Sequence, residues 1–272
     1  MNRKLFIIIS DGGGVNALTG VHLDEQNYIN FFKSPEGGAW KNDEILVFNN
    51  NNFSLQCLSE FLHVCRLNGT AIDYIMMVYC GHGFTDEYGN IQFQVQPQIN
   101  LSLNEILVTV SDIRLLLIAD SCRAVYNLHE GGRIRGVQQL FQPSDERQSE
   151  FYANICRQIY NELIMNTPQN MKTILFADSY GETAAENRNG GLYSYQLLST
   201  AKNMIDEFNE RHQHTNVRYY DGDIISCHNI ASRKVSNLTN DTQHPEIYWR
   251  CRSVAQLPFV VCPNWHLQDL GE

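Results

Sequence analysis

Short runs of consecutive apolar residues alternate along this chain with stretches in which apolar residues recur at helical spacing. The runs LFIII at 5–9 and LLLIA at 115–119 are typical of strands that are buried on both faces of a sheet. Between such runs, the segment 54–67 places its apolar side chains on one face of a helix. The alternation predicts an α/β fold, in which helices cover both faces of a mostly parallel sheet.

The same pattern assigns most of the chain to individual elements. Strands are predicted at 4–10, 44–49, 71–79, 112–120 and 172–178, and helices at 22–33, 54–67, 102–110, 150–166 and about 191–211. Alternating residues around Gly89 indicate a hairpin, 224–238 is a candidate helix, and 257–261 is a last strand that closes the pattern. The rest of 215–248 has no pattern that we can assign.

The segment 123–149 is polar, contains glycine and lacks periodicity, so we predict a long loop there. Long loops without secondary structure are usually functional or disordered in compact domains. No internal repeat and no Pro/Gly/Ser-rich linker divides the chain, which favours a single domain over residues 1–272.

Composition and charge argue against several classes of function. Hydrophobic residues make up 43% and charged residues 18% of the 272 residues, as in ordinary globular proteins. The formal net charge of −10 disfavours a nucleic-acid partner, because phosphates would be repelled. The longest apolar runs are too short to span a bilayer and none reads as a signal peptide, so we expect a cytoplasmic protein without membrane partners. The eight cysteines include no CxxC pair, which argues against a zinc site and favours free thiols.

Candidate chemistry gathers where the predicted strands end. In open α/β sheets, active sites lie beyond the carboxyl ends of the strands. That rule points to four segments of this chain, Asp11–Gly14, Cys80–Gly83, Asp120–Cys122 and Asp178–Gly181.

A histidine and a cysteine at two of these strand ends form a candidate catalytic dyad. If the strands are neighbours, His82 would act as the general base and Cys122 as the nucleophile, because an imidazole can take the proton of a thiol. The backbone N–H groups of Gly83 and Cys122 would stabilise the oxyanion. The alternative is a core histidine and a buried thiol at two strand ends, and spacing alone does not separate these interpretations.

The order of the motifs resembles the caspase–metacaspase–paracaspase family of cysteine proteases. YCGHG at 79–83 is similar to the metacaspase YSGHG, with Cys80 in the place of the serine, and DSC at 120–122 is similar to the metacaspase DSC or DCC. Arg123 and the two residues after it stand where metacaspases usually have HSG, which is a departure from the family pattern.

Further segments extend the resemblance over roughly residues 4–261. LTGVHLD at 18–24 and ADSYGETAAE at 177–186 are similar to family motifs, and HPEI and LPFVV resemble the closing segment of bacterial members. The resemblance implies a caspase-like three-layer sandwich with a six-stranded sheet. It also implies a cysteine endopeptidase for which a His–Cys dyad suffices.

The resemblance also implies a class of substrate. Metacaspases and paracaspases bind Arg or Lys through acidic side chains, and the matching positions in this chain are Asp24, Asp120 and Glu186. We therefore expect protein or peptide substrates that are cleaved after a basic residue, with Arg preferred over Lys because carboxylates match the planar guanidinium. Each acid also has a structural alternative, namely a helix cap for Asp24, a strand-end acid for Asp120 and a solvated loop residue for Glu186.

Small bacterial relatives of caspases often act as effectors in antiviral defence or cell death, so the resemblance allows release by an activating partner or a small signalling nucleotide. The loop 123–149 lies where caspases carry their processing linker. It contains four arginines, Arg123, Arg133, Arg135 and Arg147, and we predict cleavage after one of them. The resemblance leaves calcium activation open, but no EF-hand loop is present, and no cofactor is predicted.

Two other interpretations compete with a protease. The run from Gly12 to Ala17 satisfies the dinucleotide pattern G-x-G-x-x-A after a strand. The second strand, however, ends in Asn49–Asn52 without an acid to hold a ribose, and a nucleotide site would leave GHG and DSC unexplained. The other alternative is a caspase-fold binding module without catalytic activity.

Overall fold

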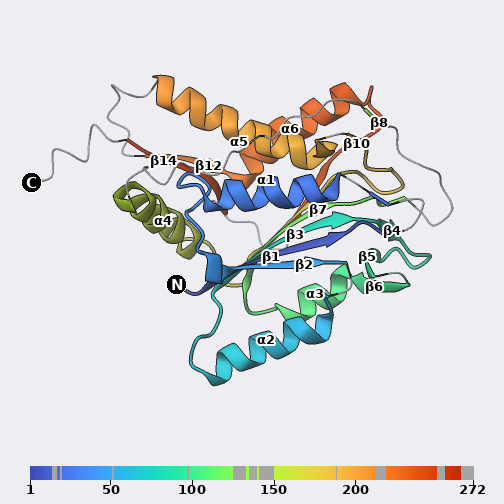
Figure 1. The fold of residues 1–272 in the computed structure, drawn as a ribbon, viewed down its shortest axis with the longest axis horizontal. Coiled ribbons are helices and arrows are strands. Elements are labelled where there is room, and N and C mark those ends of the chain that lie inside the picture. The colour runs from blue at the N-terminus through green and yellow to red at the C-terminus, as the bar shows by residue number, and fades with distance from the viewer. Residues whose placement is uncertain are drawn as a thin grey trace, which may run out of the picture.

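A six-stranded sheet lies at the centre of the computed structural model (Figure 1). The structure describes residues 1–13, 17–18, 20–50, 52–96, 98–124, 133–134, 140, 150–187, 189–211, 219–249 and 255–264. The strand order is β13-β9-β7-β3-β1-β2, with β1 at Arg3–Ser10, β2 at Ile45–Asn49, β3 at Tyr74–Gly81, β7 at Arg114–Asp120, β9 at Lys172–Phe176 and β13 at Glu246–Trp249. All neighbours are parallel except β13, which pairs antiparallel with β9.

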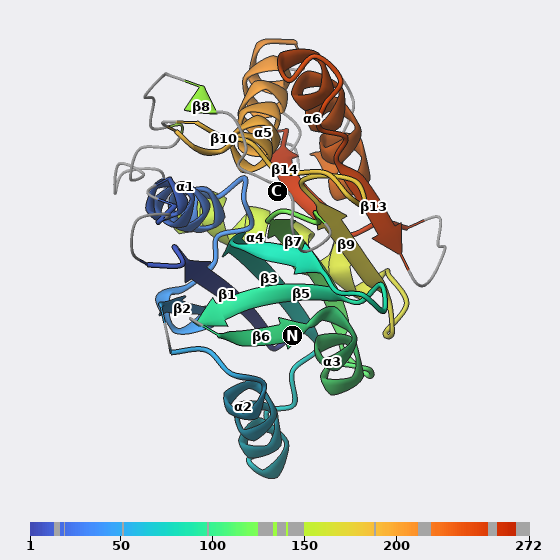
Figure 2. The same cartoon turned by 90° about the vertical axis from the view of Figure 1, so that its right-hand side faces the viewer.

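Helices cover both faces of this sheet, as Figure 2 shows. One face carries α1 (Val21–Lys33), α4 (Glu150–Met165), α5 (Leu192–Arg211) and α6 (Ile224–Leu238), and the other carries α2 (Leu55–Leu67) and α3 (Leu103–Thr109). A short 3-10 helix, η2 (Asn42–Glu44), leads into β2. This is the layered α/β arrangement that the alternation of apolar runs and helical stretches predicted.

The apolar strands are continuous because each face of the sheet has its own core. Along β1, Leu5, Ile7 and Ile9 belong to the core beneath α1, α4, α5 and α6. Phe6 and Ile8 point the other way and pack with side chains of α2 and α3. A strand that is buried on both faces needs apolar residues at every position, since successive side chains alternate between the two faces.

Three smaller sheets accompany the central one. They consist of β4 (Gly83–Thr85), β5 (Ile91–Gln96) and β6 (Ile99–Ser102); β8 (Arg133–Ile134), β10 (Glu186–Asn187) and β11 (Gly190–Gly191); and β12 (Tyr219–Asp223) with β14 (Pro258–Pro263). The strands β4, β8 and β10 lie on the side of the molecule toward which β1, β3 and β7 run (Figure 1). The carboxyl ends of the central strands are therefore surrounded by short strands and loops.

The predicted elements are present within a few residues of their expected bounds, with two corrections. The strand at 257–261 does not belong to the central sheet, because β14 pairs antiparallel with β12. The sixth strand is instead β13, which lies in a segment without a recognisable pattern. The expected start of the third strand at residue 71 is also too early, because Asp73 exchanges hydrogen bonds with Asn2 and β3 begins at Tyr74.

Candidate active site

The register of two neighbouring strands brings the predicted dyad to one edge of the sheet. In the parallel pair β3–β7, Cys80 lies opposite Asp120, and His82 and Cys122 each follow two residues later. The two chains stay side by side beyond the strands, since the Thr85 N–H donates to the carbonyl of Ala124 at 3.1 Å. The structure thus brings His82 and Cys122 to the same end of adjacent strands.

The loop after β1 lies against the imidazole of His82. A Cβ atom at Gly12 would be 2.3 Å from Cδ2 and 2.6 Å from Nε2 of His82. Gly12 also has a φ of +78°, in the left-handed region that favours glycine. On the other side, the hydroxyl of Tyr79 donates to the carbonyl of His82 at 2.6 Å. Gly12 therefore packs against the ring of His82, and Tyr79 holds the backbone carbonyl of the same residue.

Gly83 allows the histidine loop to approach the cysteine loop closely. A Cβ at this position would lie 2.7 Å from Oγ of Ser121 and 2.9 Å from the carbonyl oxygen of Cys122. Any larger residue would push the two loops apart. The glycine after the histidine is thus required by the packing of the loops, whatever its backbone N–H does in a reaction.

The Cys122 side chain lies in a mostly enclosed place and is a neutral thiol there. Burial raises the pKa of this thiol to about 11, and the charges of Asp178 and Asp120 act in the same direction. Its Sγ donates a weak hydrogen bond to the carbonyl oxygen of Ala184 at 3.9 Å. A base is needed to make this sulfur a nucleophile, and the strand register supplies His82 nearby.

Arg123, directly after the cysteine, is built into the protein interior and is 8% exposed. Its Nη1 donates to the carbonyl of Asp178 at 3.0 Å and to the carboxylate of Glu246 at 2.7 Å. The guanidinium carbon lies 4.4 Å from the ring centre of Phe176. The residue that departs from the metacaspase pattern therefore links the cysteine loop to the end of β9 and to β13.

Backbone contacts complete the link between the cysteine loop and the loop after β9. The N–H of Arg123 donates to a carboxylate oxygen of Asp178 at 3.0 Å, and its carbonyl accepts from the N–H of Gly181 at 3.1 Å. Buried Gln243 accepts from the N–H of Ala185 and donates to the carbonyl of Ala177, so it holds both ends of the same loop. None of these contacts has a signal in the sequence, because each joins segments far apart in the chain.

The three predicted substrate-binding acids converge in the structure. Asp24 comes from α1, Asp120 from the end of β7 and Glu186 from β10. Asp24 Oδ2 accepts the N–H of Gly191 at 2.8 Å, Asp120 Oδ2 accepts that of Ser194 at 2.8 Å, and Glu186 accepts that of Gly20. We call this cluster the acid pocket.

Glycines make room for the acid pocket. A Cβ at Gly190 would lie 2.0 Å from Asp24 Oδ1, and one at Gly191 would lie 2.2 Å from Asp120 Oδ2. A Cβ at Gly20 would lie 2.5 Å from Glu186 Oε1. The adjacent glycines Gly190 and Gly191 are the feature of the sequence that could have indicated a close approach of the backbone to these acids.

Burial and mutual repulsion change the acidity of the pocket. Asp24 is 1% exposed, and burial, with the charges of Asp120 and Glu186, raises its pKa well above the ordinary value. Burial also raises the pKa of Asp120 to about 6. Asp24 Oδ1 is buried and has no hydrogen-bond partner among the described residues. The pocket is therefore electrostatically suited to a cation.

Cys80 is buried next to Asp24 and Asp120 of the acid pocket. Burial raises the pKa of its thiol well above the ordinary value, and the charges of Asp24 and Asp120 add to the effect. Because it is fully buried, its position favours a packing role over a redox role.

Most of the predicted loop 123–149 lies outside the described residues, including Arg135 and Arg147. Within it, Arg133 and Ile134 form β8, whose backbone pairs in parallel with Glu186 and Asn187. Arg123 is a correction to our expectation, because it is a buried, paired side chain rather than part of an accessible loop.

The start of α1 bears on the nucleotide interpretation. Residues 14–16 of the glycine-rich run lie outside the described residues, and α1 begins only at Val21. The N–H of Gly20, at the N-cap of this helix, is already bound by the carboxylate of Glu186. An acid at this helix start repels a phosphate, which disfavours a dinucleotide there.

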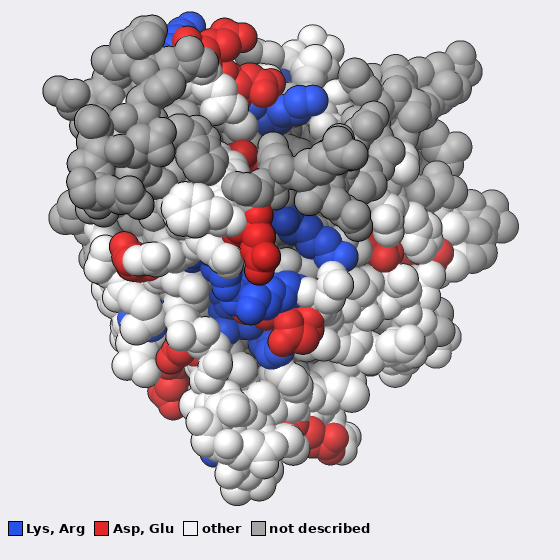
Figure 3. All heavy atoms as spheres, turned by 60° about the vertical axis from the view of Figure 1, so that its left-hand side comes forward, with Lys and Arg blue, Asp and Glu red and all other residues white. Residues whose placement is uncertain are grey.

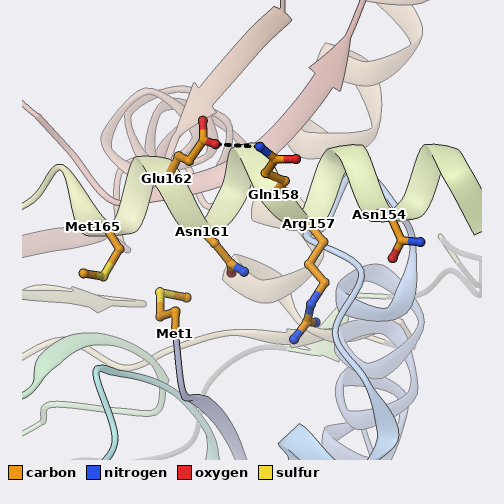
Figure 4. A pocket seen from close by; sticks show the side chains of 7 residues that line it. All are labelled: Met1, Asn154, Arg157, Gln158, Asn161, Glu162 and Met165. Atoms are coloured by element: carbon orange, nitrogen blue, oxygen red, sulfur yellow. Dashed lines mark hydrogen bonds between the residues drawn. The ribbon is translucent and has the colours of Figure 1, made fainter.

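A hollow of about 420 Å³ lies elsewhere, along α4. Figure 4 shows it between the side chains of Met1, Arg157 and Met165, at the amino end of β1. On this side of the molecule, basic side chains gather beside acidic ones (Figure 3), and Arg157 forms an ion pair with Glu44. The hollow has neither a thiol nor an imidazole in its lining, so it is not a candidate active site.

Searches for other kinds of site gave negative results within the described ranges. No group of three or more His, Cys, Asp or Glu side chains in them could hold a metal ion. None of the helices in the same ranges is long and apolar enough to cross a membrane. Seven cysteines lie in these ranges, and all seven are free thiols.

Comparison with known proteins shows the fold. No protein-family model and no curated protein sequence matches the chain. A structural-genomics crystal structure of a Geobacter sulfurreducens protein is similar, with a TM-score of 0.54 and 12% identity over 95% of this chain and 97% of that chain. Caspase-1 from Spodoptera frugiperda is also similar, with a TM-score of 0.52 and 13% identity over 91% of this chain and 87% of that chain. The chain thus has the predicted caspase-like α/β sandwich fold. At identities this low, the similarity shows the fold alone.

Proposed function

We propose that the protein is a cysteine endopeptidase that cleaves proteins or peptides after a basic residue, with Arg preferred over Lys. The observation that carries the proposal is the shared strand end, where His82 and Cys122 follow paired residues of β3 and β7 beside the acid pocket. Asp120 belongs to both features, since it ends β7 two residues before the cysteine. A substrate side chain held by the acids would therefore lie close to the thiol.

In the proposed reaction, His82 takes the proton of the Cys122 thiol as the sulfur attacks the scissile carbonyl carbon. The N–H groups of Gly83 and Cys122 stabilise the resulting oxyanion. The imidazolium then gives its proton to the leaving amine, and a thioester remains on Cys122. A water molecule that loses a proton to His82 hydrolyses the thioester, which releases the acid product and restores the thiol.

The acid pocket supports the proposed choice of substrate. A guanidinium offers five donors in a planar fork, which suits carboxylates that approach it from several elements. An acidic substrate side chain would instead bring a further negative charge into a buried cluster of acids. The proposal therefore favours Arg over Lys, and either of them over Asp.

A catalytically silent binding module is the second candidate, and the state of the Cys122 thiol bears on it. The raised pKa of the Cys122 thiol keeps the sulfur protonated in this structure. The raised pKa is compatible with catalysis if His82 removes the proton during the attack, and it is compatible with a silent protein if no such step occurs.

Variants of the dyad separate these two functions. We expect Cys122→Ala and His82→Ala each to abolish cleavage of arginine peptides while circular dichroism shows an intact fold. Cys156→Ala is the matched control, because Cys156 is also a buried thiol but lies in α4. Assays should be run with and without calcium. Cleavage by the Cys122→Ala protein at the wild-type rate would rule out this nucleophile.

A further inference from the structure

Among the side chains that the structure describes, the acid pocket gathers negative charge without a positive partner. Each of its three carboxyls accepts a backbone N–H. The charges of Asp120 and Glu186 raise the pKa of Asp24, and the charge of Glu186 raises the pKa of Asp120. No Lys or Arg side chain that the structure describes forms an ion pair or hydrogen bond with Asp24, Asp120 or Glu186. Backbone N–H groups and the Ser194 side chain therefore provide the stabilisation that the described contacts show.

The described titratable groups whose pKa is influenced by the acids of the pocket carry no positive charge. They are Cys80 from β3, Tyr28 from α1, Tyr193 from α5, and Cys122 and Asp178 beyond the ends of β7 and β9, with Glu25 near Cys80. All of these groups are neutral or negative in every protonation state. Their presence makes full ionisation of the three acids harder.

Carboxyls that share a buried place cannot all be charged at once, so at least one keeps a proton. Asp24 is the most buried of the three, and no donor among the described residues stabilises a charge on its Oδ1. The direction of the pKa changes agrees with the geometry, since those of both Asp24 and Asp120 are raised.

We propose that the acid pocket, without substrate, holds a proton shared by its carboxyls, and that a cationic substrate side chain displaces this proton into solvent as it binds. This inference rests on the proposed function, since it concerns the same pocket and the same class of substrate. The exchange balances simply: the carboxylic acid gives H⁺ to a buffer base, and the resulting carboxylate pairs with the guanidinium.

The exchange predicts the sign of a pH dependence. A group that is protonated in the free protein and ionised in the complex makes binding stronger as pH rises. While the free pocket holds the proton, the Kd for an arginine ligand should fall about tenfold per pH unit for each proton released. For Asp120 this dependence lies between its ordinary pKa and the raised pKa of about 6. For Asp24 it extends further upward, because the pKa of Asp24 is raised well above the ordinary value.

Calorimetry on the Cys122→Ala protein measures the proton directly, because acylation cannot occur in this variant. The ligand is an acetylated tripeptide amide ending in arginine, and the control ligand ends in citrulline, its uncharged isostere. Titrations at pH 6.5 in buffers of different ionisation enthalpy give the number of protons released. We expect about one proton for the arginine peptide and none for the citrulline peptide.

Two further substitutions in the Cys122→Ala background test whether the released proton comes from the carboxyls of the acid pocket. Asp24→Asn should abolish most of the release while arginine still binds, with a Kd about tenfold higher; Glu186→Gln, at a less buried position, is the second variant if Asp24→Asn does not fold. Glu36→Gln is the matched control, since Glu36 is a carboxyl of raised pKa that hydrogen-bonds Tyr152 of α4, away from the pocket.

The outcomes distinguish this inference from the proposed function. If the arginine peptide binds more tightly than the citrulline peptide but its heat does not depend on the buffer, the proton exchange is wrong and the substrate class stands. If both peptides bind equally, or neither binds, the proposed substrate class fails and the inference fails with it. Release that is unchanged in Asp24→Asn and Glu186→Gln would also overturn the inference.

Discussion

Gly12 shows how a single residue without a side chain can determine where a neighbouring ring lies. Its missing Cβ lets the loop after β1 pack against the ring of His82. We expect Gly12→Ala to lower kcat/KM by about a hundredfold, because displacing a catalytic group by about 1 Å has effects of that size. Steady-state kinetics on peptide substrates would measure the loss.

Gly13 provides a close control for this prediction. It also has a positive φ, of +65°, but a Cβ there would have no neighbour within 4 Å. Gly13→Ala therefore imposes similar backbone strain without touching the imidazole. If the two alanine variants lose the same activity, strain in the loop rather than contact with His82 is the cause.

The protonated state of Cys122 leads to a second prediction at the residue scale. Because burial raises the pKa of this thiol to about 11, the thiolate fraction should increase about tenfold per pH unit below that value. Alkylation of Cys122 by iodoacetamide should therefore accelerate steadily from pH 7 to pH 9, as followed by mass spectrometry. Exposed Cys57 in the same samples calibrates the reagent. A rate that levels off below pH 8 would show a preformed thiolate and would contradict this account.

At the scale of elements, Arg123 connects the cysteine loop with the edge of the sheet. We expect Arg123→Lys to reduce kcat by about tenfold or more with a smaller change in KM. Lysine keeps the charge but loses both the fork and the stacking on Phe176. Glu246→Gln should have a weaker effect in the same direction, because the Glu246 side chain is 49% exposed.

Arg157→Lys is the matched control for this link. Arg157 also pairs with a glutamate, Glu44, but at the amino end of the sheet. A comparable fall in kcat in Arg157→Lys would indicate a general loss of stability. A change in KM with an unchanged kcat in Arg123→Lys would contradict a role of Arg123 in placing the cysteine loop.

The segment after the cysteine loop leads to another prediction at this scale. Since Arg123 is buried and paired, processing within 123–149 should occur after Arg133, Arg135 or Arg147. Mass spectrometry of wild-type and Cys122→Ala protein under the same conditions identifies the cut. Identical intact masses of the two proteins, measured while the wild type cleaves peptides, would exclude self-processing.

At the scale of the whole molecule, the sequence was sufficient where burial determines residue type. The inner strands β1, β3 and β7 are apolar at nearly every position because both faces of the sheet are covered, so the strands themselves and a candidate site at their ends could be predicted. The edge strand β13 was missed, because it has only four residues and its Tyr248 is half exposed. An edge strand carries less of the apolar signal on which such a prediction depends.

The candidate site also has a part that the sequence predicts and a part that only the structure shows. His82, Cys122 and the three acids could be proposed from motifs at strand ends and from a family resemblance. Contacts such as those of Gln243 with the loop after β9 could not, because they depend on the antiparallel return of β13 along β9. The sequence thus identifies the groups that would react, and the fold shows what holds them in place.

The central claim is peptide cleavage after a basic residue by Cys122, and kcat/KM for matched peptides with Arg, Lys, Asn or Asp at the cleavage position tests it most directly. The acid pocket predicts values that decrease from Arg to Lys, with Asp several orders of magnitude below Arg, because an acidic side chain would enter a buried cluster of acids. The Cys122→Ala protein should cleave none of the four. Equal or better cleavage after Asp or Asn, or no Cys122-dependent cleavage of any peptide, would contradict the account.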